Sequence, residues 1–316
     1  MPSPDGPIAV SGAAGYLGGR VVAALGTSAR ALLRTPVPWL PAHLQVTCDL
    51  LRPADDIARS LEGASTAIHL AGHNEVVAAE DPERALTETV AMADSLRSAA
   101  VAVGIRRIVY VSTVHVYGDH LRPGALVHEG LEARPTSAYA RARATCEDVL
   151  RADAEVESVV LRLSNAVGAP ADPSVDRWTL VASDLCRQAV LDRTMVLRST
   201  GQQWRDFIVL EDACRLVLAT LQDRVAPGTY NLASGRPATV RSLAELIQDR
   251  VERMCGWRPG LEGPAPVGEP DEPYVIGTDG LGSLGLRAEL PLEEGVDEII
   301  DHCIKHEAAL RGGAGR

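Results

Sequence analysis

This chain of 316 residues contains almost no lysine: Lys305 is the only one, and arginine supplies the other basic side chains. Together with abundant Ala, Gly, Pro and Val, this bias indicates a G+C-rich genome. The formal net charge is −11, and no long basic run occurs. Because a negatively charged surface repels a phosphate backbone, we expect no nucleic-acid partner.

The chain also lacks any run of about eighteen apolar residues, the length that a membrane span requires. Its first residues, MPSPDGPIAV, have neither the charged segment nor the apolar core of a secretory signal. The six cysteines are scattered without a C-x-x-C pair, which disfavours a disulfide framework or a zinc site. We therefore expect a soluble, cytoplasmic protein with reduced thiols and no membrane partner.

One further pair of side chains has metal-ligand spacing. His302 and His306 lie four residues apart on an expected helix, with Cys303 between them. Two ligands at that spacing can hold a metal, but the sequence offers no third one. We therefore interpret both histidines as surface residues and predict no metal site.

The first half of the chain alternates short apolar runs with segments of helical periodicity. Such alternation predicts an α/β fold in which a doubly wound, parallel Rossmann sheet is covered by helices on both faces. The expected strands are 8–12, 29–34, 44–50, 65–72, 107–113 and 158–164, and the expected helices are 16–26, 54–62, 83–103 and 136–153.

The rhythm changes after about residue 165, where a loop over 168–176 interrupts it. The later helices are expected at 178–191, 210–222, 240–254 and 293–310, the later strands at 203–209 and 229–232, and a Pro- and Gly-rich loop at 258–273. We predict a dinucleotide-binding domain over 1–165 and a smaller substrate-binding cap over 166–316, with the chain crossing back to the first sheet.

A glycine-rich turn, SGAAGYLGG, joins the first expected strand to the first expected helix. Gly12, Gly15 and Gly18 have the spacing that a tight turn, close approach to a pyrophosphate and close helix–strand packing require. This placement favours a dinucleotide site over a turn that serves packing alone. Tyr16 and Leu17, inside the turn, are included among the expected cofactor-binding residues.

The end of the second expected strand bears on the choice of cofactor. An acid there would take the ribose 2′-hydroxyl of NAD, but this strand ends in Arg34, whose guanidinium suits a 2′-phosphate. The prediction is NADP(H), against the alternative that Arg34 is a solvated surface arginine; Arg20 is a candidate helper. Further cofactor contacts are expected at Asp49 and Leu50 and in the segment Leu70, Ala71 and Gly72.

Taken together, these segments resemble an extended short-chain dehydrogenase/reductase, of the branch that contains sugar-nucleotide epimerases, dehydratases and ketoreductases. The resemblance covers nearly the whole chain and rests on motifs in the family's order: SGAAGYLGG, CDLLRP, IHLAG, VYVSTVHVYGD, SAYARARATCE, LRLSNAVG, QWRDFIVLEDAC and GTYNLASGRPATVRSLAELI.

The resemblance implies a catalytic set of Ser or Thr, Tyr and Lys. Thr113 and Tyr139 match the first two, with Ser112 a second choice, whereas Arg143 stands where the lysine belongs. Such a tyrosine supplies a proton to the substrate oxygen, the hydroxyl holds that oxygen, and a nearby cation eases the proton transfer. Arg143 is expected to touch the cofactor ribose, as Tyr139 is expected to touch the cofactor.

Arginine keeps the positive charge but does not readily release a proton, so the family's lysine–water relay would be broken. Thr89 is a second departure, because the family often has asparagine at that place. Three interpretations remain: an active reductase with a modified relay, a reductase that draws its proton from elsewhere, and a silent dinucleotide-binding protein.

The resemblance also implies substrate contacts at Asn165 and Arg205, and His115 lies close enough to the expected site to be a candidate. The alternatives are an ordinary loop histidine and a structural ion pair between Arg205 and Asp206. The family's second phosphate-binding arginine falls near Val267, in an acidic loop without arginine. This incomplete anion clamp favours a less anionic ketone.

We therefore expect an NADPH-dependent ketoreductase that acts on a small-molecule natural-product intermediate, either an aromatic polyketide or a deoxysugar. The alternatives are a sugar-nucleotide epimerase or dehydratase that retains NAD, and a non-catalytic dinucleotide-binding protein. By analogy with the family, the chain is a candidate homodimer.

Overall fold

The computed structural model describes residues 6–152 and 155–312. Its centre is a seven-stranded sheet in which every pairing is parallel. In spatial order the strands are β11 (Gly228–Leu232), β7 (Glu157–Leu163), β5 (Arg107–Thr113), β4 (Thr66–His69), β1 (Ile8–Ser11), β2 (Ala29–Leu33) and β3 (Gln45–Thr47). The predicted α/β class and parallel Rossmann sheet are confirmed.

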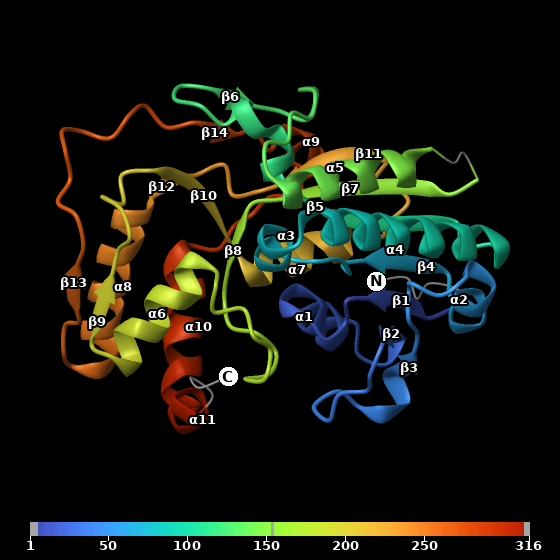
Figure 1. The fold of residues 1–316 in the computed structure, drawn as a ribbon, viewed down its shortest axis with the longest axis horizontal. Helices are drawn as coiled ribbons and strands as arrows, with labels where there is room; N and C mark the ends of the chain where they lie inside the picture. Colours follow the sequence, from blue (N-terminus) through green and yellow to red (C-terminus); the bar gives the residue numbers. More distant parts are fainter. Residues whose placement is uncertain (1–5, 153–154, 313–316) are drawn as a thin grey trace.

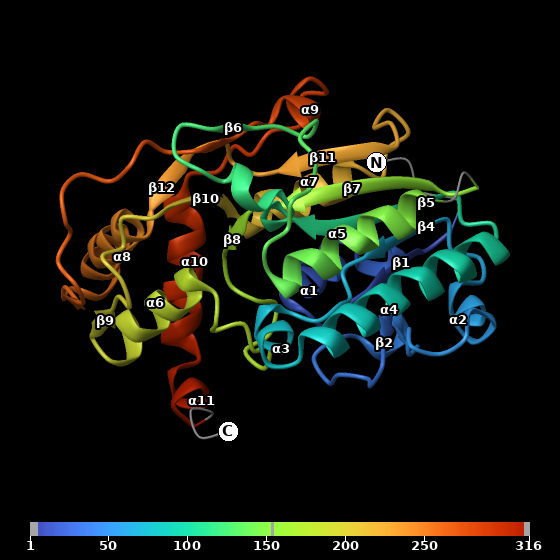
Figure 2. The same ribbon diagram turned by 45° about the horizontal axis from the view of Figure 1, so that its top comes forward.

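Helices cover both faces of this sheet (Figures 1 and 2). One face carries α2 (Ala54–Leu61), α4 (Pro82–Ala102) and α5 (Ala138–Arg151), and the other carries α1 (Tyr16–Leu25) and α7 (Leu210–Ala219). The central strands β1, β5 and β7 are buried on both faces, which explains why they read as continuous apolar runs and not as alternating ones. Figure 2 shows α4 and α5 lying side by side across their face.

The remaining elements form a second layer beyond one end of the sheet (Figure 1). Its helices are α6 (Val181–Leu191), α8 (Val240–Cys255), α10 (Leu292–Lys305) and α11 (Glu307–Gly312); its strands are β8 (Asn165–Val167), β9 (Thr194–Val196), β10 (Trp204–Val209), β12 (Pro237–Thr239) and β13 (Gly260–Glu262). These elements share their own apolar core. We call this layer the cap.

Several short elements escaped the sequence-based prediction. They are α3 (Glu75–Glu80), α9 (Asp279–Gly282), the 3-10 turns η1 (Gly26–Ser28), η2 (Ala42–Leu44) and η3 (Val114–His120), the paired strands β6 (Leu126–Val127) and β14 (Val275–Ile276), and the cap strands β8, β9 and β12. Strand β13 lies inside the stretch 258–273, which was expected to be a loop. Each has too few residues to show a period.

The chain returns to the central sheet after entering the cap. Strand β10 leads into α7, and β11 then pairs with β7 at the sheet edge. Residues 210–232 therefore belong to the sheet layer in space, although they lie within the predicted cap range of 166–316. The domain division at residue 165, together with the crossing back that accompanied it, stays a prediction.

A buried ion pair fixes α5 against the sheet. Glu147 is fully buried, and its carboxylate accepts hydrogen bonds from Ser112 Oγ at 2.5 Å and Arg162 Nη2 at 2.7 Å. Ser112 lies on β5 and Arg162 on β7, so one side chain of α5 is bound to two strands. The register of α5, which carries Tyr139 and Arg143, depends on this contact.

We predict that Glu147→Gln lowers the free energy of unfolding by about 3 kcal/mol, because it leaves the buried Arg162 guanidinium without a counter-charge. Urea denaturation measures the change. Asp148→Asn is the matched control, since Asp148 is the exposed neighbour that pairs with Arg151 at the helix surface. Equal stability of the two variants would contradict the role assigned to Glu147.

Candidate functional site

The glycine turn lies at the carboxyl end of β1, as predicted. Gly12 has φ +68°, and a side chain there would meet the Ala71 amide nitrogen at 2.8 Å. A Cβ at Gly18 would overlap the Gly12 carbonyl oxygen. Gly15 caps α1 without any side-chain bond, so the first amides of this helix face outward as an anion site requires. Only glycine therefore fits at positions 12 and 18, two of the three glycine positions of this turn.

A cavity of about 440 Å³ opens beside this turn. Eight of the predicted cofactor residues line it: Gly12, Gly15, Arg34, Asp49, Leu50, Leu70, Ala71 and Gly72. Sequence reasoning missed His73, Glu88 and Met92, which complete the wall next to α4. A cradle that excludes side chains, a helix start and a nearby guanidinium together suit a dinucleotide.

Three other residues that were expected to contact the cofactor do not line this cavity. Tyr16 donates its hydroxyl to the Gly168 carbonyl at 2.6 Å, and burial raises the pKa of this phenol. Leu17 packs into the core, and Gly18 serves the contact between helix and strand. These residues form the start of α1, but their side chains are not part of the cavity wall.

Arg20, the candidate helper, does not line this cavity. Its guanidinium pairs with Glu298 of α10 and, at 2.8 Å, with Glu211 of α7. It also donates to the Ala169 carbonyl. These bonds tie α1 to the cap and leave Arg34 as the guanidinium in the cavity wall.

Tyr139 and Arg143 lie together on the first turns of α5. The Arg143 guanidinium carbon is 5.3 Å from the centre of the Tyr139 ring. Arg143 is only 7% exposed, and it donates long hydrogen bonds to the Ala71 carbonyl at 3.5 Å and the His73 carbonyl at 3.4 Å. The residue in the lysine position is therefore bonded to two residues of the cavity wall, although Arg143 itself is not among the lining residues.

The charge of Arg143 is permanent. Burial acts to lower the pKa of this guanidinium, but interactions with the phenols of Tyr139 and Tyr110 outweigh it and raise the pKa. Within the described residues, no carboxylate pairs with Arg143, and its Nε has no hydrogen-bond partner. A buried cation without a counter-ion is a strong electrostatic feature for a ligand to meet.

Gly72 makes room for this arrangement. A Cβ at Gly72 would come within 3.0 Å of Arg143 Nη1 and 2.9 Å of the Thr89 methyl. Thr89 in turn accepts a hydrogen bond from the His73 amide at 3.1 Å. The two departures from the family pattern, at positions 89 and 143, thus lie on either side of one glycine.

A neutral histidine lies behind Arg143. His69 Nδ1 is 2.7 Å from Ser11 Oγ, and its ring stacks on Tyr110. Burial, followed by the Arg143 charge, lowers the pKa of His69 to about 3. His69 therefore adds no second positive charge beside Arg143 at neutral pH.

Thr113 ends β5 and is buried, and its hydroxyl accepts a hydrogen bond from the His115 amide at 3.3 Å. The hydroxyl proton of Thr113 remains available to a ligand. Ser112, the second choice, is committed to Glu147 on the opposite side of the strand. Because side chains alternate along a strand, the hydroxyls of Ser112 and Thr113 lie on opposite faces of β5.

The three residues that were expected to contact substrate all follow β5 in the chain. His115 lies in the turn η3 that follows β5, and desolvation by its surroundings, followed by the Arg205 charge, lowers the pKa of its ring. Asn165 donates to the Asp206 carbonyl at 2.8 Å. Arg205 bonds the Trp204 carbonyl, while the Asp206 carboxylate is bound by Ser164 and Ser234; the alternative ion pair between Arg205 and Asp206 is not formed.

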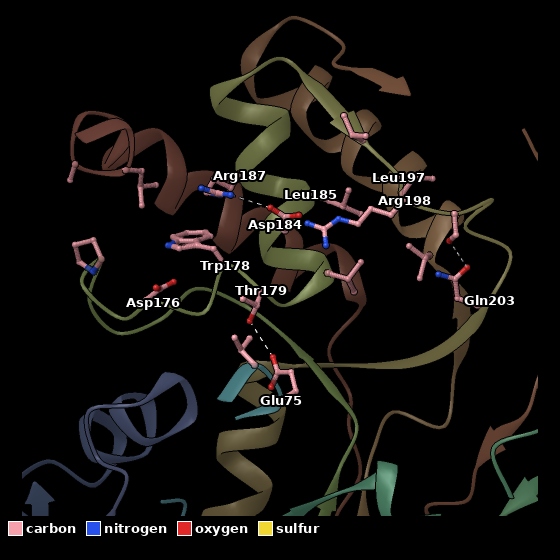
Figure 3. A pocket seen from close by; sticks show the side chains of 18 residues that line it. Glu75, Asp176, Trp178, Thr179, Asp184, Leu185, Arg187, Leu197, Arg198 and Gln203 are labelled. Carbon is pink, nitrogen blue, oxygen red and sulfur yellow. Dashed lines mark hydrogen bonds and ion pairs between the residues drawn. The ribbon is translucent and has the colours of Figure 1, made fainter. Parts of the chain in front are cut away.

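A second and larger cavity, of about 860 Å³, lies between the cap and the start of α3 (Figure 3). Its wall includes Trp178, Asp184, Arg187, Arg198 and Gln203, and none of the three expected substrate residues. Figure 3 shows the Arg198 guanidinium reaching toward Asp184, which is bonded to Arg187. Sequence reasoning did not predict this cavity, because nothing in the spacing of these residues brings them together.

His302, in the last turn of α10, was predicted to be a surface residue, and the structure differs from this prediction. His302 is 8% exposed and not a surface residue, and its ring lies 4.6 Å from the His306 ring and 6.2 Å from Trp178. Nowhere in residues 6–152 and 155–312 do three or more His, Cys, Asp or Glu side chains gather to hold a metal ion. In the same ranges, no helix is both long and apolar enough for a bilayer.

Comparison with known proteins identifies the class. The NAD dependent epimerase/dehydratase family matches residues 8–233, and the chain belongs to this family, within the extended short-chain dehydrogenase/reductases. Members of the family depend on a nicotinamide dinucleotide, and its enzymes modify sugar nucleotides.

Two relatives and one solved structure show which enzymes the chain is similar to. The dTDP-6-deoxy-L-talose 4-dehydrogenase (NAD(P)(+)) of Kitasatospora kifunensis is 31% identical over 212 residues, which are 65% of each protein. The chain thus spans less than two thirds of that relative. The GDP-6-deoxy-D-mannose reductase of Pseudomonas aeruginosa is 27% identical over 76% of this chain and 78% of its own. A structure of MoeE5 in complex with UDP-glucuronic acid and NAD superposes with a TM-score of 0.77, at 25% identity, over 95% of this chain and 99% of that one.

We predict that the His69 ring does not titrate between about pH 5 and 8, because the folded protein holds it neutral. The unfolded chain takes up this proton near pH 6.5 and the folded one near pH 3. The contribution of His69 to stability is therefore complete above about pH 6.5 and is lost as the pH falls toward 3. NMR of the ring protons tests this, with free histidine as reference; a transition near pH 6.5 would contradict it.

Proposed function

We propose that the chain is an NADP(H)-dependent ketoreductase that reduces the keto group of a nucleotide-linked deoxysugar to a secondary alcohol. The observation that carries the proposal is the pairing of the Tyr139 phenol with the buried, permanently charged Arg143 beside the dinucleotide cavity. The two relatives named above, a dehydrogenase and a reductase of deoxysugar nucleotides, support it.

Each residue has a definite task in this reaction. A nicotinamide dinucleotide supplies the hydride when bound. Thr113 donates a hydrogen bond to the substrate oxygen, and Tyr139 gives that oxygen its proton. Arg143 stabilises the negative charge left on the phenol and, because it holds its own protons, does not take part in proton transfer.

The preference for the phosphorylated cofactor rests on Arg34. This residue follows β2, is exposed, and lines the cavity where a ribose 2′-phosphate would be expected. Thr35 beside it offers a hydroxyl, and no acid follows β2 to bind the 2′-hydroxyl of NAD.

Replacing Arg34 by methionine is expected to weaken NADP⁺ binding about 10- to 100-fold, because a charge-assisted bond to the 2′-phosphate is lost. NAD⁺ affinity should change less than about twofold. Fluorescence titration measures both constants, and Arg30→Met, on the same strand, is the control. An equal loss for both dinucleotides would show that Arg34 does not read the 2′-phosphate.

The larger cavity supports a nucleotide-linked substrate over an aromatic polyketide. Its lining is charged and polar around Arg187, Arg198, Asp184 and Gln203, with Trp178 as an aromatic wall. An aromatic polyketide would desolvate these charged groups without offering them charge-assisted hydrogen bonds. Phosphates and a base satisfy them better.

An epimerase or dehydratase that retains its cofactor is the second candidate. It is favoured by the likeness to MoeE5, whose structure holds UDP-glucuronic acid and NAD. A reductase must exchange its dinucleotide in every turnover, whereas an epimerase returns the hydride to the same substrate. Cofactor retained through gel filtration and turnover without added NADPH would favour this candidate.

We expect Tyr139→Phe to lower NADPH oxidation with dTDP- and GDP-linked 4-keto-6-deoxysugars at least about 100-fold, since the proton donor is removed. NADP⁺ affinity should stay within about threefold. Absorbance at the NADPH band measures turnover, and Tyr230→Phe, outside both cavities, is the control. Undiminished turnover in Tyr139→Phe would contradict the mechanism and favour a proton from another source.

A further inference from the structure

His73 has no part in the reaction described above, yet it lines the dinucleotide cavity. It is the only histidine in that wall, which also contains the guanidinium of Arg34 and the carboxylates of Asp49 and Glu88. A dinucleotide brings an ionised pyrophosphate into the same space. The wall thus has one permanent positive charge, Arg34, against two carboxylates, and a second positive charge would favour such a ligand.

The main chain and the ring of His73 are held from three sides. Its amide donates to Thr89 Oγ1 at 3.1 Å, and its carbonyl accepts from Arg143 Nη2 at 3.4 Å. Its Nε2 lies 2.6 Å from a Glu88 carboxylate oxygen. An imidazole fixed in this way is positioned before any ligand arrives.

Glu88 determines which ring nitrogen carries a proton. Hydrogen bonds from His73 and from Arg84 hold the pKa of Glu88 below its ordinary value. An ionised carboxylate can only accept, so Nε2 must donate. Within the described residues, Nδ1 has no protein partner, and it remains for a ligand.

The charges around the ring favour its protonated form once a phosphate is near. Glu88 and Arg84 face it from α4, Arg143 reaches its carbonyl from α5, and Asp49 and Arg34 lie in the same cavity wall. Arg84 and Arg143 oppose a further positive charge, whereas Glu88, in direct contact, and an incoming pyrophosphate favour it.

We propose that His73 is a cofactor-binding residue that meets a dinucleotide phosphate as an imidazolium, donating Nδ1–H, with Glu88 as its positioning residue. Dinucleotide binding then takes up protons, and it weakens once the ring has lost its positive charge. The inference rests on the proposed dinucleotide binding and adds the group that makes this binding proton-linked.

Isothermal titration calorimetry with NADP⁺, in buffers of different ionisation enthalpy from pH 6 to 9, tests the proposal. We expect the wild-type protein to take up more protons than His73→Asn does. The variant should bind about tenfold more weakly near pH 6 and approach the wild type near pH 9. The difference between the two proteins cancels the titration of the 2′-phosphate itself.

Two further variants sharpen the test. Glu88→Gln keeps the ring but removes the carboxylate, so it should also lose the extra proton uptake. His43→Asn, the same change at an exposed histidine outside both cavities, should match the wild type. Proton uptake that is unchanged in both His73→Asn and Glu88→Gln would overturn the inference alone. Failure of the wild type to bind NADP⁺ or NAD⁺ would overturn the proposed cofactor and the inference with it.

Discussion

The buried charge of Arg143 is the constraint on which the rest of the site depends. A guanidinium that is 7% exposed and has no carboxylate partner is unfavourable unless dipoles and a ligand compensate it. Two backbone carbonyls and a tyrosine ring supply part of this compensation, and Gly72 leaves the space. Helix α5 tolerates the charge because Glu147, one turn further on, fixes its register to two strands.

The end of β4 connects the two cavities. Gly72 and His73 line the smaller one, and Glu75, two residues on, lines the larger one at the start of α3. A short segment therefore separates the expected cofactor from the expected substrate, at the carboxyl edge of the sheet where doubly wound folds bind ligands. Glu75 is itself bound by Arg177 and Thr179, so this segment is also tied to the chain that leads into the cap.

Sequence reasoning predicted the sheet well because its strands are buried on both faces and its helices are long enough to show a period. It predicted the glycine turn because only glycine fits at Gly12 and Gly18. It failed where contacts join distant segments: the pairing of Arg20 with Glu298, the burial of His302, and the larger cavity. Short strands such as β13 carry no periodic signal, and the His73–Glu88 pair becomes visible only once α4 packs beside β4.

The central claim is that a dinucleotide lies across the glycine turn with its reactive ring beside Tyr139 and Arg143. A crystal structure with NADP⁺ bound tests it most directly. The account predicts nicotinamide electron density within contact distance of the Tyr139 hydroxyl, and the Arg143 guanidinium against the adjoining ribose. Density that placed the nicotinamide ring away from Tyr139, or the dinucleotide outside the cavity formed by Gly12 and Gly72, would contradict it.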